Sequence, residues 1–298
     1  MKKESMTALI SLFARAYHRE HNKIRIFDDS VAGRLLTECE YERIAERMAD
    51  GIGWFCPSFQ GTEEEALRWV VDNQLSPAVL GRAAFAERAL QTAVRLGTGQ
   101  LLVLGAGYDT FAFRQPEWAK KLSILEVDHP ATAEDKQSRL NYAGVEIPGN
   151  VCFVAADFEE WGWERLIFEC ERFSRDKISF CSLLGVVYYV SGEVFKSILS
   201  FVSALPRGSA LAFDYPEKNR GERTEKQAAL AEAAQEKMQT GFTCREMEKL
   251  LADYGLLLYE HLTPQEMTEQ YFSAYNAANP SHRMTAMENT NYCLAVKR

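Results

Sequence analysis

The sequence predicts an α/β fold with a mostly parallel sheet of about seven strands and helices on both faces. From residue 100 onward, short apolar runs of strand length alternate with segments of helical pattern, which is typical of parallel sheets. Before that point the apolar residues recur mainly with helical spacing. We therefore expect an N-terminal helical extension over residues 1–96, which acts as a cap, and an α/β core over residues 97–298.

The N-terminal extension is expected to be almost entirely helical. Its last helix has a clear start signal, because Pro77 follows Ser76 and proline fits the first turn of a helix. The expected helices lie at residues 7–17, 31–36, 41–48, 63–71 and 77–96.

The core contains seven apolar runs that we interpret as strands, at residues 101–104, 123–127, 151–156, 178–184, 209–213, 256–259 and 292–296. Helical patterns at 131–142, 193–204 and 244–254 separate most of them. Only part of the segment 264–289 has a helical pattern, so the last strand can be antiparallel to the rest of the sheet.

Composition narrows the class of protein. The chain has 298 residues, of which 47% are hydrophobic, and a formal net charge of −8, which opposes binding to nucleic acid. No stretch approaches the roughly 18 apolar residues of a membrane span, and no signal peptide is visible, so we expect a cytoplasmic protein. The seven cysteines show no metal-ligand spacing, and we expect free thiols and no metal. The oligomeric state is not predicted.

The most informative motif is a glycine turn after the first strand, followed by acids at the end of the second. Gly105, Ala106 and Gly107 follow the apolar run, and glycines there allow a ligand to approach the backbone closely. Of Glu126 and Asp128 we expect one to reach the ligand, and Asp128, at the strand's end, is the better candidate for ribose hydroxyls. The alternative role for Asp128 is a cap for the helix after Pro130.

The third strand ends in the same way, in Asp157 and Phe158. The carboxylate is placed to accept from an adenine amino group while the ring covers the base, or else Asp157 caps a helix starting near Glu159. Ligands of such sheets bind at the carboxyl ends of the strands. The motifs together predict a nucleotide-type cofactor, and the missing third glycine of the dinucleotide fingerprint disfavours NAD.

The stretch from Leu104 to Arg114, and Glu126 to Pro130 with Lys136, resemble the leucine carboxyl methyltransferase family and its bacterial O-methyltransferase relatives. The N-terminal residues Arg15 to Tyr17 and Ile26 to Asp29 extend the resemblance over nearly the whole chain. It implies a class I methyltransferase-like Rossmann fold and S-adenosylmethionine (SAM) as the cofactor. It also implies that residues 214–241 form a lid-like insertion over the acceptor pocket.

The resemblance also assigns roles by position. It implies that Gly105 and Gly107 line the methionine part of SAM, that Asp128 holds the ribose, and that Asp157 with Phe158 flanks the adenine. An arginine upstream of the glycine turn is expected to pair with the SAM carboxylate. Arg82 matches that position best and Arg88 is the alternative, with Arg15 as a weaker candidate for a second basic contact.

One position departs from the family pattern, because Leu184 stands where the fourth strand of family members carries a glutamate. This puts the family's substrate in doubt. Of the side chains near predicted strand ends (Tyr188, Tyr189, His129 and His261), we choose Tyr189 as the candidate catalytic or substrate-contacting residue. Tyr271, Phe272 and Tyr275 form an aromatic stripe that is either core or the wall of an aromatic pocket.

The sequence therefore predicts a SAM-dependent methyltransferase that acts on a carboxylate or hydroxyl oxygen of a small molecule. Two alternatives stay open. The absence of a clear catalytic group favours a SAM-binding protein without transferase activity. A nicotinamide-dependent oxidoreductase is less favoured, because no Tyr-x-x-x-Lys motif is evident.

Overall fold

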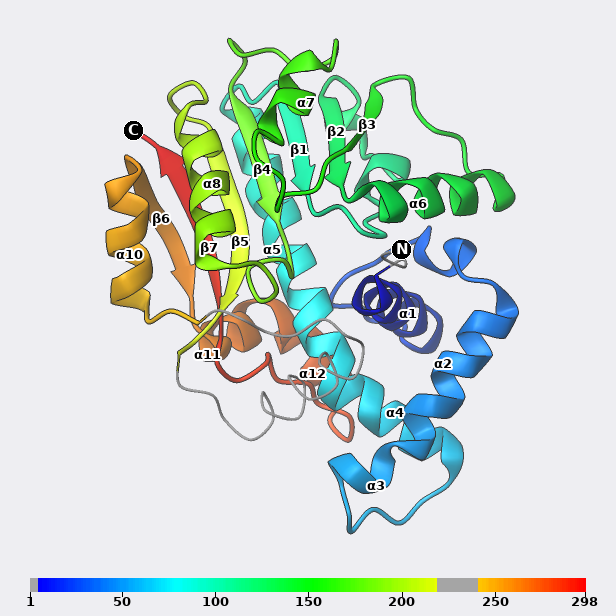
Figure 1. Ribbon diagram of the computed structural model, residues 1–298. Helices are drawn as coiled ribbons and strands as arrows, with labels where there is room; N and C mark the ends of the chain where they lie inside the picture. The colour runs from blue at the N-terminus through cyan, green and yellow to red at the C-terminus, as the bar shows by residue number, and fades with distance from the viewer. Residues whose placement is uncertain (1–4, 219–240) are drawn as a thin grey trace.

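The computed structural model describes residues 5–218 and 241–298. Its centre is one seven-stranded sheet with the order β3-β2-β1-β4-β5-β7-β6, in which β7 runs antiparallel to both of its neighbours (Figure 1). All seven predicted strands and the antiparallel end are confirmed. The strands are β1 (Gln100–Leu104), β2 (Ser123–Asp128), β3 (Val151–Ala155), β4 (Ser179–Leu183), β5 (Ala210–Pro216), β6 (Leu256–Leu262) and β7 (Thr290–Lys297).

Helices surround the sheet and form the N-terminal extension. Those before the sheet are α1 (Met6–His21), η1 (Ala32–Leu35), α2 (Glu38–Asp50), α3 (Ile52–Phe55), α4 (Glu63–Val70), η2 (Val71–Leu75) and α5 (Ser76–Arg95). Those within the core are η3 (Phe111–Phe113), η4 (Glu117–Ala119), α6 (Pro130–Tyr142), α7 (Glu164–Glu169), α8 (Gly192–Ser203), α10 (Cys244–Asp253), α11 (Pro264–Met267), η5 (Thr268–Phe272) and α12 (Ser273–Ala278).

Local sequence signals fix several helix starts. The Thr37 side chain accepts from the Glu40 N–H while Glu40 reaches back to the Thr37 N–H, which is a capping box at the start of α2. Thr62 and Thr243 begin α4 and α10 in the same way. Each box satisfies two backbone donors that a helix start otherwise leaves without partners.

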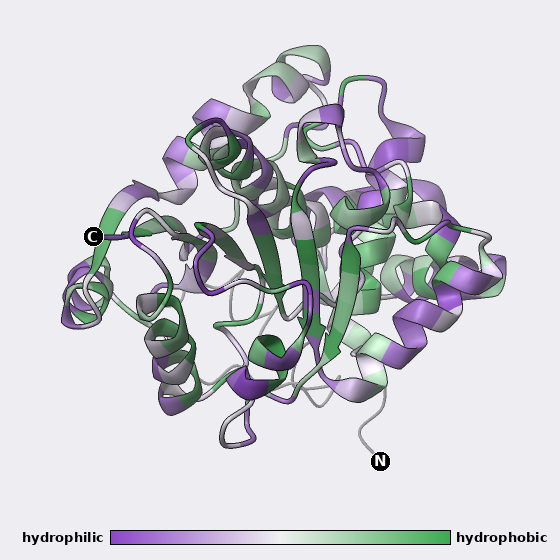
Figure 2. Cartoon of the chain, turned by 90° about the horizontal axis from the view of Figure 1, so that it is seen from above, coloured by the Kyte–Doolittle hydropathy of each residue, from purple (hydrophilic) through white to green (hydrophobic). Residues whose placement is uncertain are grey.

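The sheet is buried between two helical layers. The buried residues of α8 and α10 pack with Leu104, Cys181 and Leu211 on one face. The apolar side of α5 packs with Leu101 and Val103 on the other. Figure 2 shows the hydrophobic colour gathered on the central strands and hydrophilic residues on the surrounding helices. Burial on both faces explains why the central strands β1, β4 and β5 are largely apolar.

The N-terminal helices form a third core at the carboxyl ends of the parallel strands. Leu12 and Phe13 of α1 pack there with Val79 of α5 and with Tyr108, which follows the glycine turn. Figure 1 shows α1 below the arrowheads of β1 and β2. Because α5 also covers the sheet, the N-terminal extension and the core share this helix. The extension therefore lies directly over the carboxyl ends of the parallel strands, where the sequence predicts a ligand.

Two details differ from the expectations. Asp214 and Tyr215 belong to β5, which continues to Pro216, so the expected insertion at 214–241 begins later; residues 219–240 lie outside the described part of the chain. The short helices α3 and α7 were not predicted, because four and six residues are too few to show a helical period. In the described residues, no helix is long and apolar enough to cross a membrane.

Candidate cofactor site

The glycine turn after β1 has a backbone conformation that requires glycine. Gly105 and Gly107 have φ values of 69° and 46°, in the left-handed region that other residues rarely adopt. A Cβ atom on Gly105 would lie 2.4 Å from Val186 Cγ2, and one on Gly107 would lie 3.2 Å from Ala8 Cβ. The Gly105 and Ala106 N–H groups donate to the Val127 carbonyl of β2. The turn is thus held tightly at the carboxyl end of the sheet, between the loop after β4 and helix α1.

Asp128 lies at the end of β2, next to this turn. One carboxylate oxygen accepts from the Gly107 N–H, and the other accepts from the His129 N–H at 2.7 Å. Burial raises the pKa of Asp128, and the two backbone donors offset part of that effect. Each oxygen has a second lone pair, so the carboxylate retains capacity to accept from a ligand hydroxyl.

Glu126 lies two residues earlier on the same face of β2 but deeper in the protein. Its carboxylate is 2.7 Å from the ammonium of Lys136 on α6, and both side chains are almost completely buried. Burial raises the pKa of Glu126 to about 7, although Lys136 favours the ionised form. The structure thus pairs Glu126 with Lys136 inside the protein, and Asp128 is the acid of β2 that lies nearer the glycine turn.

Asp157 and Phe158 follow β3, the strand beside β2. Asp157 Oδ1 accepts from the Glu159 N–H, which caps a turn, whereas the next helix starts only at Glu164. Asp157 Oδ2 lies 3.7 Å from His129 Nε2. The ring of Phe158 packs edge-on against Trp163 at a centroid distance of 4.8 Å. The two predicted residues therefore lie at the same edge of the sheet as Asp128.

Arg82 of α5 lies at the carboxyl end of β4. Its Nη1 is 3.6 Å from Asp214 Oδ2, and its Nη2 donates to Ser11 Oγ at 3.4 Å. A Cβ on Gly185 would come within 2.5 Å of Arg82 Nη1, so glycine is required where the guanidinium passes the strand end. Both polar contacts are long, and a guanidinium has five N–H donors, so Arg82 retains donors for an anionic group.

Arg88, the alternative to Arg82, lies elsewhere. Its Nη2 donates to both carboxylate oxygens of Glu260 on β6, at 2.6 and 2.7 Å. The guanidinium also lies over the ring of Tyr271. Since β6 is at the far edge of the sheet from β2 and β3, the structure does not bring Arg88 to the other candidates.

Asp214 is a partner of this site that the sequence did not reveal, and Tyr188, which the sequence offered beside Tyr189, pairs with it. Asp214 Oδ1 accepts from the Gly185 N–H at 2.6 Å, and Oδ2 accepts from the Tyr188 hydroxyl at 3.0 Å. Burial, and then the Asp214 charge, raises the pKa of Tyr188 well above its usual value. Asp214 thus ties the ends of β4 and β5 together and supplies the negative charge that faces Arg82.

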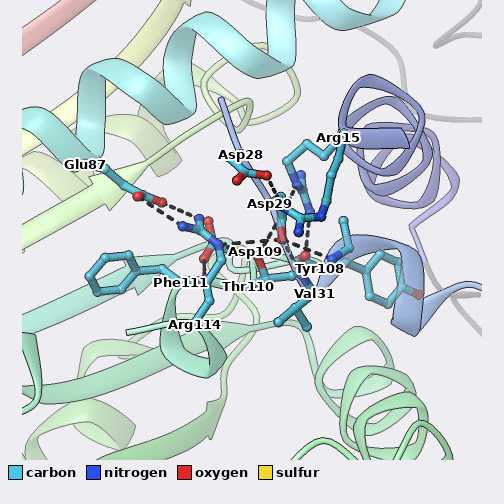
Figure 3. Close-up of polar contacts among 12 residues, drawn as sticks. Arg15, Asp28, Asp29, Val31, Glu87, Tyr108, Asp109, Thr110, Phe111 and Arg114 are labelled. Atoms are coloured by element: carbon cyan, nitrogen blue, oxygen red, sulfur yellow. Dashed lines mark hydrogen bonds and ion pairs between the residues drawn. The ribbon is translucent and has the colours of Figure 1, made fainter. Parts of the chain in front are cut away.

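A second unpredicted feature is a network around Asp29 that joins the N-terminal segment to the glycine turn (Figure 3). Asp29 accepts from Arg15 Nε at 2.8 Å and from Thr110 Oγ1 at 2.7 Å, while Arg15 Nη2 donates to the Tyr108 carbonyl at 2.6 Å. Burial opposes ionisation of Asp29, but Arg15 and Arg114 outweigh it and lower its pKa. Arg15 is therefore engaged in holding the loop rather than pointing a free guanidinium at a ligand.

The other candidates are dispersed. Tyr189 is half-buried in the turn after β4, and its N–H donates to the Val186 carbonyl. His261 of β6 pairs with the Tyr215 hydroxyl at 3.0 Å. Phe272 and Tyr275 are core residues, and Leu184 packs against the core on the α5 side of the sheet. Among the described residues, no group of three or more His, Cys, Asp or Glu side chains could hold a metal ion.

Comparison with known proteins identifies the family of this chain. The model of the leucine carboxyl methyltransferase family matches residues 8–203. The chain belongs to the leucine carboxyl methyltransferase family. The match starts within α1 and ends in α8, so this family's pattern covers the N-terminal cap as well as the strands that carry the candidate residues.

Individual relatives agree with the family assignment. YktD of Bacillus subtilis (strain 168), named as an S-adenosyl-L-methionine-dependent methyltransferase, is 40% identical over 306 residues, which covers 99% of this chain and 98% of YktD. A Mycolicibacterium paratuberculosis protein with the same description is 28% identical over 144 residues, which covers 48% of this chain and 53% of that protein.

Two solved structures share the fold of this leucine carboxyl methyltransferase family member. A DUF574 family protein from Streptomyces avermitilis aligns with a TM-score of 0.64 and 15% identity, covering 99% of this chain and 98% of that one. A methyltransferase from Thermobifida fusca YX aligns with a TM-score of 0.57 and 15% identity, covering 99% and 96%. They confirm the predicted class I methyltransferase-like fold.

Proposed function

We propose that this protein transfers the methyl group of SAM to an oxygen atom, a carboxylate or a hydroxyl, of a small molecule. Family membership supplies the coarser statement: the protein is a SAM-dependent methyltransferase and SAM is its cofactor. The observation that most supports our assignment of the site is the convergence of the glycine turn, Asp128, Asp157 and Arg82. They lie at the carboxyl ends of four adjacent strands, where ligands bind in α/β sheets.

The residues present fit SAM in chemistry. The cofactor has a carboxylate at one end, which Arg82 is suited to bind because a guanidinium pairs with a carboxylate through two hydrogen bonds. Gly105 and Gly107 would line the methionine part, because their left-handed φ values of 69° and 46° give the turn a sharp bend that other residues rarely adopt. Asp128 would accept from the ribose hydroxyls, and Asp157 with Phe158 would flank the adenine.

The chemistry demands little of the protein beyond alignment. When bound, SAM supplies a methyl group already activated on a sulfonium, so the protein gains most by orienting the acceptor and excluding water. A carboxylate acceptor needs no base, whereas a hydroxyl acceptor does. Tyr189 remains our candidate for contact with the acceptor, from the turn after β4.

The test is transfer of isotope-labelled methyl from SAM to a panel of small carboxylic acids, phenols, amines and thiols. We expect label only on oxygen, and treatment with mild base distinguishes a methyl ester, which hydrolyses, from a methyl ether, which does not. Label on nitrogen, sulfur or the protein itself would contradict the proposal. Tyr189→Phe should raise KM for the acceptor and leave SAM affinity unchanged.

A further inference from the structure

Two free thiols meet at an edge of the sheet, apart from the residues assigned to the cofactor. Cys152 lies in β3, the edge strand, and Cys170 directly follows α7. Their Sγ atoms are 3.0 Å apart, and both side chains are half-buried. A disulfide bond needs about 2.05 Å, so the sulfurs would have to approach by only about 1 Å.

Both thiols are accessible from a surface cavity. The cavity has a volume of about 410 Å³, and Cys152, Cys170, Glu169, Glu171 and Arg172 are among the residues that line it. Small organic ligands occupy cavities of about 300–1,000 Å³, so a small reagent has room beside the two sulfurs.

We propose that Cys152 and Cys170 form a reversible disulfide by exchange with a low-molecular-weight disulfide. One thiolate attacks the reagent, forms a mixed disulfide and expels one small thiol. The second cysteine then attacks the protein sulfur of that mixed disulfide and expels the other small thiol. Two protein thiols become one disulfide, the reagent is reduced to two thiols, and the two cysteine protons end on the leaving thiolates.

The surroundings of the two thiols suggest an order of attack. Burial, and then the neighbouring Cys170, raises the pKa of the Cys152 thiol to about 11, so Cys152 is a poor first nucleophile. We therefore expect Cys170 to react first and Cys152 to resolve the mixed disulfide. Cys152 can resolve the mixed disulfide despite its raised pKa because the two sulfurs start only 3.0 Å apart.

The bridge would close a loop that carries part of the candidate site. The chain between the two cysteines contains Asp157 and Phe158, and Phe158 packs against Trp163 at the start of α7. A bridge should therefore restrict the segment that flanks the adenine. This consequence rests on the proposed function, but formation of the bridge does not.

The experiment treats the full-length protein with 2-hydroxyethyl disulfide, a neutral reagent that the two glutamates do not repel. Trypsin cleaves at Arg165, between the two cysteines, so a bridge appears as a cross-linked peptide pair that disappears on reduction. Cys39 is exposed and should react with the reagent, but it should stop at a mixed disulfide. It serves as an internal control.

The variants test the order of attack. Cys152→Ser should retain the small-thiol adduct on Cys170, whereas Cys170→Ser should leave Cys152 several-fold less modified. Cys39→Ser should form the bridge as the unmodified chain does. Recovery of Cys152 and Cys170 as separate adducts, or as free thiols while Cys39 reacts, would overturn the proposal.

Hydrogen exchange tests the consequence for the loop. In the bridged protein, amides of residues 153–169 should exchange several-fold more slowly, while those of residues 26–32 should not change. Equal exchange in both redox forms would refute the restriction of the loop. Because the bridge is detected by mass alone, its outcome is independent of whether methyl transfer occurs.

Discussion

Asp128 is the side chain on which the cofactor assignment depends most. Its two oxygens each accept one backbone N–H, and each has a second lone pair that can accept from a ligand hydroxyl. We predict that Asp128→Ala weakens SAM binding by about 1–3 kcal/mol, the usual cost of lost hydrogen bonds to a charged group. Asp253→Ala, which removes an exposed acid on α10, should bind SAM normally in the same calorimetric titration. Unchanged affinity in the Asp128 variant would refute its ribose role.

Arg82 and Arg88 form a matched pair, because they are identical side chains on one helix with different partners. Arg82 is near Gly185 and Asp214, whereas Arg88 is paired with Glu260. Arg82→Ala should lower SAM affinity by about 10- to 150-fold, which corresponds to about 1.5–3 kcal/mol for hydrogen bonds to a charged group. Arg88→Ala should lower it less than twofold. The reverse result in binding assays would move the carboxylate site to Arg88.

His18 of α1 should make stability depend on pH. It is fully buried, its Nε2 accepts from the Ile26 N–H, and burial followed by the nearby Arg25 lowers its pKa from 6.5 to about 4. The folded state therefore favours the neutral ring. This contribution is complete above pH 6.5 and is lost as the pH falls through about 4, and it amounts to about 3 kcal/mol.

The measurement is urea unfolding of the unmodified chain and of His18→Gln at pH 7.5 and pH 4.5. The pKa values of Glu40 and Asp29 are also lowered, so acidification removes their contribution to the free energy of unfolding in both proteins. The difference between the two proteins therefore reports on His18. The variant should lose about 2.5 kcal/mol less than the unmodified chain over this range, because a small part of the His18 contribution remains at pH 4.5. Equal losses would show that His18 does not titrate in this way.

Among the structural elements, α1 and the segment after it not only cover the sheet but also hold the glycine turn in place. The Asp29 network links α1 through Arg15, and the glycine turn through Thr110, into one unit. Removing one partner of a buried ion pair costs about 3–5 kcal/mol. We predict that Asp29→Asn destabilises the fold by about this amount and speeds amide exchange at residues 105–111.

The neighbouring Asp28 provides the control, because it is exposed and its ion pairs with Arg19 and Arg25 lie on the surface. Asp28→Asn should change the free energy of unfolding by less than about 1 kcal/mol. If both variants behave alike, the network does not support the glycine turn.

The same elements show what a sequence can and cannot predict. The central strands were predictable because burial on both faces makes runs such as β1 and β2 largely apolar, and the candidate cofactor residues were chosen because they follow those runs directly. The contact of Asp29 with Thr110 joins residues 81 positions apart, and no local pattern marks it. Asp214, Tyr188 and Gly185 likewise meet only because β4 and β5 are neighbours in the sheet.

In the molecule as a whole, the parallel strands bring the candidate residues to one edge, and the N-terminal helices close over that edge. Glu126 shows the limit of reading acids at a strand end, because its partner Lys136 comes from the next helix and keeps it inside. Arg88 shows a similar limit for arginines on a helix, because its partner Glu260 comes from β6. In both cases the structure shows a tertiary partner that sequence spacing alone did not reveal.

The most direct test of the central claim is calorimetric titration of the protein with SAM, with its demethylated product and with NADH in parallel. We predict saturable binding of SAM and of the product and no binding of NADH, and weaker SAM binding in the Arg82→Ala and Asp128→Ala variants. If NADH binds and SAM does not, the protein is not a SAM-dependent methyltransferase, and hydride transfer becomes the favoured reaction.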